Sequence, residues 1–311
     1  MRKRNYILAL LMGMLSLSPA GAQEKSPLAV LLSCKGDVTI KKPSGEAIKG
    51  TFGISLMDGD VVLTGADASA ELLYEDGLYV EVGPGSEVRV GKASGAPSDP
   101  SPGRTFEMVQ DFIKLKDTEG TSHLAGFRGK HEEGLRLESP SQTRIRANDI
   151  VFTWNGAGAG DELRVTIESE SGVHFQKDVE GTTRFEYPPE APELVPGTSY
   201  SWAVETTDPL RFPPLRSPAA FFEVITPEDE NRLQASLADI SGEKHRGGSA
   251  HPLVRASIFH GFGLLDDAIA ETRKAVGEDS SNRMLHAILA NLYEEAGRTD
   301  EALAEYKKLA E

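Results

Sequence analysis

The sequence predicts a multidomain chain of the β plus α class, in which two β modules precede an α-helical repeat region. Residues 29–90 and 135–226 both contain short apolar runs separated by Gly, Pro and Asp, as strands joined by turns require. The C-terminal residues instead match themselves at a spacing of 34, which is typical of stacked helical hairpins. Composition divides the 311 residues into segments 1–22, 27–92, 93–134, 135–226, 227–248 and 249–311.

The first segment, 1–22, has the pattern of a bacterial secretory signal peptide. A basic start at 2–4 precedes an apolar run over 7–17, and Ala20-Gly21-Ala22 supplies small residues for cleavage. The alternative is an uncleaved anchor, but a helix rising about 1.5 Å per residue over that run does not cross a hydrocarbon core about 30 Å thick. We expect cleavage near Ala22 and a periplasmic or secreted protein without stable membrane insertion.

The expected mature chain is strongly acidic. Without residues 1–22 it has 30 basic and 48 acidic residues, a formal charge of −18 instead of −15. Phosphate backbones and anionic lipids repel such a surface, so nucleic acid and peripheral membrane binding are disfavoured. We expect a basic or neutral protein partner.

Cys34 is the only cysteine, so no intramolecular disulfide forms. Residues 31–34 (LLSC) loosely resemble a lipoprotein box, in which the cysteine becomes lipidated. The continuous apolar run over 28–34 favours the other interpretation, a small buried residue in the first strand.

The first β module is predicted to be a meander. Asp58-Gly59 and Asp76-Gly77 lie between apolar runs, and Asp-Gly is a strong hairpin signal because these residues accept positive φ angles. Apolar and polar residues roughly alternate along 70–75 and 78–82, as expected where one face is buried and the other is wet.

This module resembles the FecR-type domain of bacterial envelope proteins. The best-known members are signal-transducing regulators with a cytoplasmic tail and a membrane span, neither of which is predicted here, so their sigma-factor role is not carried over. The resemblance implies a β module for protein contact outside the cytoplasm. The matching residues are 36–40 (GDVTI), 56–65 (LMDGDVVLTG), 76–77 (DG) and 82–88 (VGPGSEV).

The segment 93–134 is predicted to be a linker that contains one helix. Residues 91–103 are rich in Gly, Ala, Ser and Pro, which favours an exposed loop, and 117–134 are expected to be loose. Between them, apolar residues at helical spacing predict a short amphipathic helix that covers an end of the β module. These residues are Phe106, Val109, Phe112, Ile113 and Leu115.

The second module is predicted to be a β-sandwich with Trp154 and Trp202 between its sheets. Residues 194–204 (LVPGTSYSWAV) and 152–154 (FTW) resemble the pattern of fibronectin type III-like domains, which implies adhesion or spacing. Strands are expected near 150–154, 163–167, 173–175, 183–187, 200–204 and 221–225.

No catalytic, cofactor-binding or metal-binding residue is predicted, and the chain is not expected to be an enzyme. Gly156, Gly158 and Gly160 lack the spacing of a nucleotide fingerprint and are interpreted as a hairpin loop. The seven histidines show no metal-ligand spacing. Cys34 has no evident base beside it, and no serine lies in a nucleophile elbow.

The C-terminal region is predicted to be helical. Thr226 has the properties of an N-cap and Pro227 those of a first helical residue, and further helices are expected near 252–262, 266–276, 282–295 and 299–310. The C-terminal residues contain two copies of the 34-residue pattern, and the second copy resembles the tetratricopeptide repeat. Two repeats leave an apolar side uncovered, to be capped by the helix from Pro227 or by another molecule, including a second copy of this chain. The matching residues are Leu289, Ala290, Tyr293, Gly297, Ala302 and Tyr306.

The resemblance implies that a partner binds the inner face of the first helix of each repeat. Asn291 matches a position that commonly holds a ligand backbone. The lysine that accompanies it in carboxylate-binding members is replaced by Ala287, so no peptide C-terminus is expected, and Glu294 favours a basic or neutral segment. The alternative is a solvated face on an array that only packs against the sandwich. The candidate positions are Leu253, Ser257, His260, Ala287, Asn291 and Glu294.

The expected function is that of a non-enzymatic exported scaffold, which mediates protein–protein interaction in the bacterial envelope. One alternative is a cell-wall polysaccharide-binding protein, which exposed Trp or Tyr platforms would favour. Another is an enzyme whose site is assembled across modules. Changing Asn291 and Glu294 together to Ala is expected to weaken partner capture without lowering thermal stability.

Overall fold

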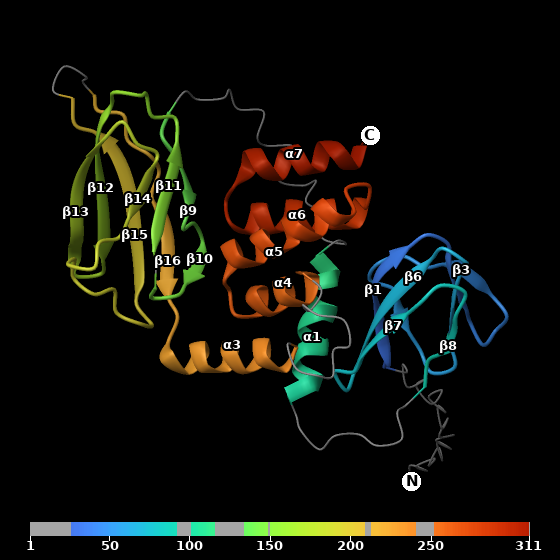
Figure 1. Ribbon diagram of the computed structural model, residues 1–311. Helices are drawn as coiled ribbons and strands as arrows, with labels where there is room; N and C mark the ends of the chain where they lie inside the picture. The colour runs from blue at the N-terminus through green and yellow to red at the C-terminus, as the bar shows by residue number, and fades with distance from the viewer. Residues whose placement is uncertain are drawn as a thin grey trace, which may run out of the picture.

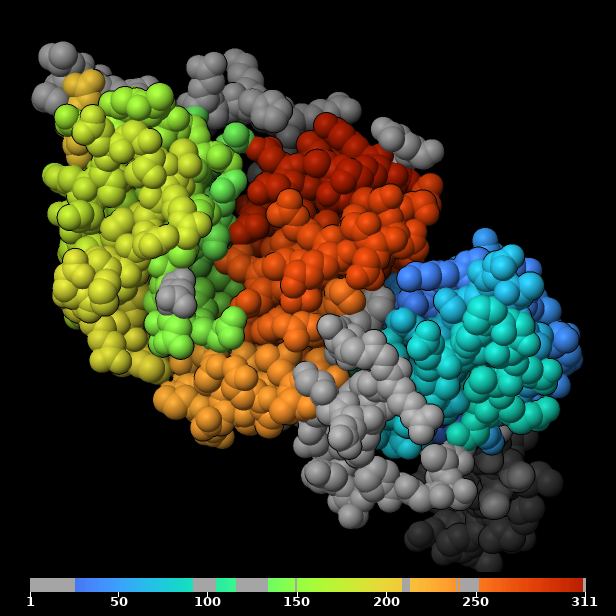
Figure 2. All heavy atoms as spheres, viewed as in Figure 1, coloured from blue at the N-terminus to red at the C-terminus, as the bar shows by residue number. Residues whose placement is uncertain are grey.

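The computed structural model describes residues 26–91, 101–115, 134–148, 150–208, 213–240 and 252–310. Figure 1 shows two β parts on either side of a stack of helices. In the space-filling view of Figure 2, the β-sandwich and the helices form a continuous body. The predicted β plus α layout is confirmed. The predicted signal peptide lies outside the described residues.

The N-terminal β part consists of two sheets. One has the strand order β4-β1-β6-β7 and the other β3-β2-β5-β8. Between them lies a core that includes Leu31, Val38 and Val62. The strands are β1 (Ala29–Lys35), β2 (Val38–Lys41), β3 (Ala47–Lys49), β4 (Ser55–Leu56), β5 (Val61–Thr64), β6 (Ser69–Tyr74), β7 (Tyr79–Val82) and β8 (Glu87–Arg89).

Strand β1 is buried on both faces, which explains its uninterrupted apolar sequence. Ala29 and Leu31 face the core between the two sheets. Val30 and Leu32 face the opposite way, into a second core shared with the helices. A strand covered on both faces needs apolar residues at successive positions instead of alternate ones.

The predicted meander is wrong. Asp76-Gly77 does join paired strands, β6 and β7. Asp58-Gly59 instead connects β4 to β5, which belong to different sheets. Gly59 still has a positive φ of 89°. The Asp58-Gly59 dipeptide therefore predicts the turn correctly. The pairing of the strands depends on contacts between residues that are far apart in the sequence.

The second β part is a sandwich of two sheets, with strand orders β10-β16-β15-β12-β13 and β14-β11-β9. Trp154 and Trp202 are 0% and 1% exposed, which confirms their predicted core positions. The Trp202 indole also donates to the Pro140 carbonyl (2.7 Å). The strands are β9 (Arg136–Ser139), β10 (Thr143–Ile145), β11 (Val151–Asn155), β12 (Glu162–Ser169), β13 (Gly172–Glu180), β14 (Arg184–Glu186), β15 (Ser199–Thr206) and β16 (Ala220–Val224).

The Gly156-x-Gly158-x-Gly160 segment is not a hairpin loop as predicted, because it passes from β11 in one sheet to β12 in the other. Its first glycine is required by a close approach of the backbone. A Cβ atom at Gly156 would lie 2.1 Å from the Gly134 carbonyl oxygen. Gly156 therefore lets the chain pass close to Gly134 where it crosses between the sheets.

The C-terminal helices form two antiparallel hairpins close to the predicted ranges: α4 (Pro252–Gly261) with α5 (Leu265–Glu278), and α6 (Arg283–Glu295) with α7 (Thr299–Ala310). Gly263 and Gly297, 34 residues apart, occupy the two turns with φ of 75° and 72°. Before them, α3 (Pro227–Asp239) begins as predicted, with Thr226 accepting a hydrogen bond from the Asp229 amide.

Helix α1 (Ser101–Lys114) joins the two halves of the molecule. It packs against α3 and α4 and, as Figure 1 shows, lies between the helical stack and the N-terminal β part. Residues 101–103 are helical, contrary to the loop predicted there, because proline fits the first turn of a helix. Phe106, Val109, Phe112 and Ile113 are all buried. The side of α4 that two repeats leave uncovered is therefore covered by α1 and α3.

Candidate partner-binding site

The six predicted binding residues lie on α4 and α6, on and near the side that α1 covers. Leu253, Ser257 and Asn291 are buried. Ala287, His260 and Glu294 are partly exposed. Ser257 donates its hydroxyl proton to the Val254 carbonyl (2.8 Å), so it is already satisfied within its own helix.

Asn291 binds backbone, but that backbone belongs to this chain. Its Nδ2 donates to the carbonyl of Leu115, directly after α1, over 2.6 Å. It also lies 3.1 Å from the Ala287 carbonyl. On the other side of the amide, Oδ1 accepts from the Tyr306 hydroxyl (2.7 Å), which also lies 2.9 Å from a Glu294 oxygen. The amide is fully engaged.

His260 contacts α1 through its ring and α6 through its nitrogen. The ring meets Phe112 edge-on, with centroids 5.5 Å apart. Its Nε2 lies 3.0 Å from a Glu295 carboxylate oxygen. His260 therefore stands at the boundary between the covered face and the open surface beyond it.

The opposite edge of the hairpins, where the turns lie, packs on the sandwich. Here two aspartates that are 34 residues apart make equivalent ion pairs. Asp266 at the start of α5 pairs with Arg298, and Asp300 at the start of α7 pairs with Arg136 on β9. Arg298 also donates to the Glu138 carbonyl (2.8 Å). Equivalent repeat positions thus each bind an arginine, which for Asp266 comes from the α6–α7 turn and for Asp300 from the sandwich.

Arg144 on β10 is the centre of this junction. Its backbone N–H donates to the Gly263 carbonyl (2.9 Å). Its guanidinium donates to Glu223, to Asp229 and to the Phe262 carbonyl, at 3.0, 2.7 and 3.2 Å. One side chain therefore connects the sandwich, helix α3 and the α4–α5 turn.

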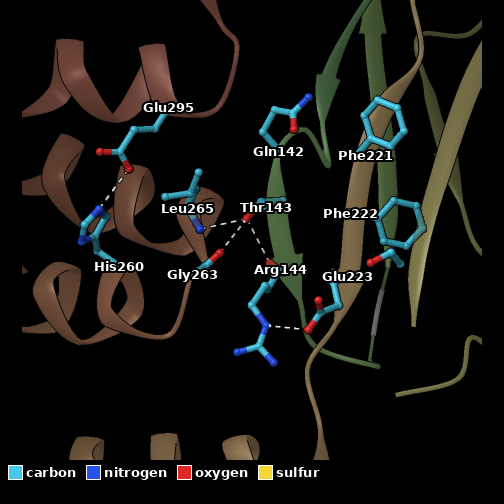
Figure 3. Close-up of a pocket in the computed structure, with 11 residues that line it drawn as sticks. Gln142, Thr143, Arg144, Phe221, Phe222, Glu223, His260, Gly263, Leu265 and Glu295 are labelled. Atoms are coloured by element: carbon cyan, nitrogen blue, oxygen red, sulfur yellow. Dashed lines mark hydrogen bonds and ion pairs between the residues drawn. The ribbon is translucent and has the colours of Figure 1, made fainter. Parts of the chain in front are cut away.

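Beside this junction lies an open groove of about 420 Å³ between the sandwich and the helices. Figure 3 shows Phe221 and Glu223 from the sandwich on one side and the His260–Glu295 pair on the other. Phe221 is 53% exposed, whereas its neighbour Phe222 is buried. The remaining lining residues are Gln142, Thr143, Arg144, Ser199, Phe222, Gly263 and Leu265.

The charged side chains that line the groove have partners within the protein. Arg144 pairs with Glu223, and a Glu295 carboxylate oxygen lies 3.0 Å from His260 Nε2. The groups that a ligand could contact are the Phe221 ring, the Gln142 amide and the Ser199 hydroxyl. These groups suit apolar contact and neutral hydrogen bonding. Sequence reasoning missed Phe221, although the alternation of side chains along a strand places one residue of the Phe221-Phe222 pair outward.

Cys34 lies in β1 and is partly buried. Burial, with smaller effects from the charges of Asp279 and Glu71, raises the pKa of its thiol to about 12. A thiol with so high a pKa is protonated and unreactive at neutral pH. Among the described residues, no group of three or more His, Cys, Asp and Glu is placed to hold a metal ion, and His245 and His251 lie outside them.

The comparisons with known proteins give weak likenesses. No family model and no curated protein matches the sequence. Similar solved structures include a cell surface anchoring domain, with 23% identity over 24% of this chain and 99% of the other, at a TM-score of 0.22. Fibronectin(III)-like modules of Clostridium thermocellum CbhA share 13% identity over 66% of this chain and 80% of theirs, at a TM-score of 0.21. A β-1,2-glucanase from Parabacteroides distasonis shares 10% identity over 92% of this chain and 49% of its own, at a TM-score of 0.23.

Within the parts of the chain that the structure describes, no helix is both long and apolar enough to span a bilayer.

Proposed function

We propose that this chain is a non-enzymatic, exported scaffold that binds another protein in the bacterial envelope. Its partner would dock in the groove between the sandwich and the helical hairpins. The observation that carries this proposal is Phe221, a large aromatic side chain that is 53% exposed on a strand of the five-stranded sheet. Exposed aromatic residues on rigid elements beside a concave surface are typical anchors of protein interfaces.

The family assignments of the three modules are part of the same proposal. The motif residues quoted above support a FecR-type N-terminal module and a fibronectin type III-like sandwich. The 34-residue period, with positive-φ glycines at 263 and 297, supports a pair of tetratricopeptide repeats. Periplasmic or secreted localisation rests on the signal pattern at 1–22.

A polysaccharide ligand is a weaker candidate. It would need an exposed Trp or Tyr platform, and both tryptophans of the chain are buried. The Gln142 amide and the Ser199 hydroxyl can form hydrogen bonds with a peptide as well as with a glycan, and a peptide also offers apolar side chains to Phe221.

Photocrosslinking tests the proposal in the full chain. With p-benzoylphenylalanine in place of Phe221, we expect a covalent adduct with one envelope protein. The matched control carries the same group in place of Val173, which is 62% exposed on β13 and does not line the groove. Phe221→Arg should lower capture at least tenfold with an unchanged melting temperature. Equal adducts at both positions would refute a specific site, and a glycan adduct at Phe221 would favour the polysaccharide alternative.

A further inference from the structure

Among the described residues, Gln142 is the one residue other than glycine that has a positive φ, 50°. Glycine adopts this left-handed region freely, and Asn and Asp do so less often, whereas it is strained for most longer side chains. The neighbouring Ser141 and Thr143 are buried, but Gln142 is exposed and lines the groove that contains Phe221. Backbone strain beside a groove indicates a function for the side chain that it positions.

The backbone and the side-chain stem of Gln142 are held in place. Before it, the Pro140 carbonyl accepts a hydrogen bond from a core indole (2.7 Å), and after it, Thr143 Oγ1 accepts one from the Leu265 amide (2.9 Å). A Cβ atom at Gly297 would lie 3.8 Å from Gln142 Cγ, so the stem lies against the α6–α7 turn. The terminal carboxamide is therefore presented from a fixed base, which reduces the entropy lost when a ligand binds.

The carboxamide of Gln142 is available to a ligand, since it has no hydrogen-bond partner within the described part of the chain. It offers an acceptor oxygen and a donor NH₂ group, which can pair with the N–H and C=O groups of a polypeptide backbone. A helix uses these backbone groups internally, except in its first and last turns. The backbone that Gln142 can recognise is therefore an extended one.

The groups available to a ligand lie across three neighbouring strands. The parallel pairing of β10 with β16 places Gln142 beside Phe221, as Figure 3 shows. Ser199 begins β15, on the other side of β16. Two strand spacings amount to about 10 Å, which about three or four extended residues span at about 3.3 Å each. A short extended segment can therefore contact all three side chains.

The charges beside these groups restrict the composition of that segment. The side chains of Glu223 and Glu295 both remain more than a third exposed in the groove. The whole chain has a formal charge of −15. An acidic segment would be repelled by both the local and the overall charge.

We infer that the groove binds an extended, non-acidic peptide segment whose backbone is recognised by Gln142 and whose apolar side chain packs on Phe221. This inference rests on the proposed protein-binding function and specifies the form of the partner. Gln142 is then a specificity-determining residue, because it selects a segment with free backbone groups over a helix. Ser199 supplies a second hydrogen bond at the far end of the segment.

A phage-displayed library of short linear peptides tests this inference with the full chain. Clones are selected on the immobilised protein, and those that also bind a Phe221→Arg variant are discarded. The remaining clones should share an apolar residue and lack Asp and Glu. One of them is then synthesised as a labelled peptide for binding measurements.

Gln142→Gly should bind this peptide at least about tenfold more weakly than wild type, because it loses the hydrogen bonds of the carboxamide. Its melting temperature should be equal to that of wild type or higher, since glycine adopts a positive φ without strain. A purely structural role of Gln142 would instead lower the melting temperature. Gln176→Ala, which removes a carboxamide on β13 outside the groove, is the matched control and should bind as wild type does.

Methylation of single backbone nitrogens of the peptide tests the same contact on the wild-type protein. At one internal position it should weaken binding at least about tenfold, because it removes a backbone donor. The same change at the end of the peptide is the control and should have no effect.

Three results would overturn the inference: no clone that depends on Phe221, equal binding to Gln142→Gly, or equal binding of all the methylated peptides. The proposed function is tested separately by the photocrosslinking at position 221. A protein adduct there, combined with any of these three results, would keep the scaffold proposal and refute the extended segment.

Discussion

Arg144 Nη2 donates to Asp229 Oδ2 over 2.7 Å, and this pair connects strand β10 of the sandwich to the first turn of α3. Hydrogen bonds from Arg232 and then from Arg144 lower the pKa of Asp229 to about 2, despite the opposing effect of burial. The carboxylate is therefore ionised throughout the physiological range, and the junction depends on that charge.

The first prediction concerns the pH dependence of this junction. Because the folded pKa of Asp229 lies below its ordinary value of 3.8, its contribution to stability is present above about pH 4. It is lost as pH falls through the folded pKa, near 2. Arg144→Gln should lower the free energy of unfolding at pH 7 by about 1–3 kcal/mol, since it removes the guanidinium hydrogen bonds to Asp229, to Glu223 and to the Phe262 carbonyl.

Urea unfolding at pH 7 and over pH 2–5 checks this prediction, with Arg184→Gln, from an exposed pair with Glu186, as the control. The difference between wild type and Arg144→Gln should shrink toward pH 2. Parallel pH profiles for the two proteins would show that the Asp229 charge does not stabilise the junction.

The second prediction concerns the sandwich core. Trp202→Ala should destabilise the sandwich by about 3–5 kcal/mol, the usual cost of removing a large buried aromatic side chain. Trp202→Phe should cost less, because it keeps an aromatic ring and loses mainly the hydrogen bond to the Pro140 carbonyl. Val173→Ala, on the exposed surface of β13, is the control. Denaturant unfolding of the full chain measures all three, and an unchanged Trp202→Ala profile would place this side chain at the surface.

Local features of the fold could be predicted from the sequence, because local chemistry decides them. Thr226 and Pro227 have the preferences of a helix start, and α3 begins there. Trp202 lies in an alternating run, which places it inward. The partners of each strand could not be predicted, since the Asp58-Gly59 turn has the same sequence whether it closes a hairpin or crosses between sheets.

The candidate site was predictable only in part, because it depends on contacts between distant segments. The apolar spacing of 106–115 predicts a helix but does not identify α4 as the surface that α1 covers. The repeat resemblance implies that Asn291 lies on the inner face of its hairpin and holds a ligand backbone, yet its partner is the Leu115 carbonyl of the same chain. The Phe221 groove exists only because α4 and α6 lie beside β16.

The third prediction concerns Cys34 and the start of the mature protein. A lipidated Cys34 would be the first residue of the processed chain, which would remove Leu31 and Leu32 from the two cores that they fill. We therefore expect mass spectrometry of exported protein to find residues 26–33 retained and Cys34 unmodified.

Alkylation of Cys34 is a second test of the same environment. With its pKa raised to about 12, the thiol should react with iodoacetamide at pH 8 at least about a hundredfold more slowly than free cysteine, since only the thiolate attacks. The rate in denaturant is the control and should match that of free cysteine. Fast alkylation of the folded chain, or a diacylated Cys34, would contradict the placement of β1.

The last prediction concerns Asn291 and Glu294, whose joint replacement by Ala was expected from the sequence to leave stability unchanged. The contacts of Asn291 now predict otherwise. Asn291→Ala removes the donor to the Leu115 carbonyl and the acceptor of the Tyr306 hydroxyl, so it should lower the free energy of unfolding by about 1–3 kcal/mol. Glu294→Ala should cost less than about 0.5 kcal/mol, because this side chain is partly exposed and Tyr306 keeps Asn291 as a partner.

Thermal and urea unfolding of the two single variants and the double variant separate these effects, with Gln176→Ala as a surface control. If the double variant is as stable as wild type, Asn291 does not hold α1 in solution, and its face is open to a partner as the repeat resemblance implied.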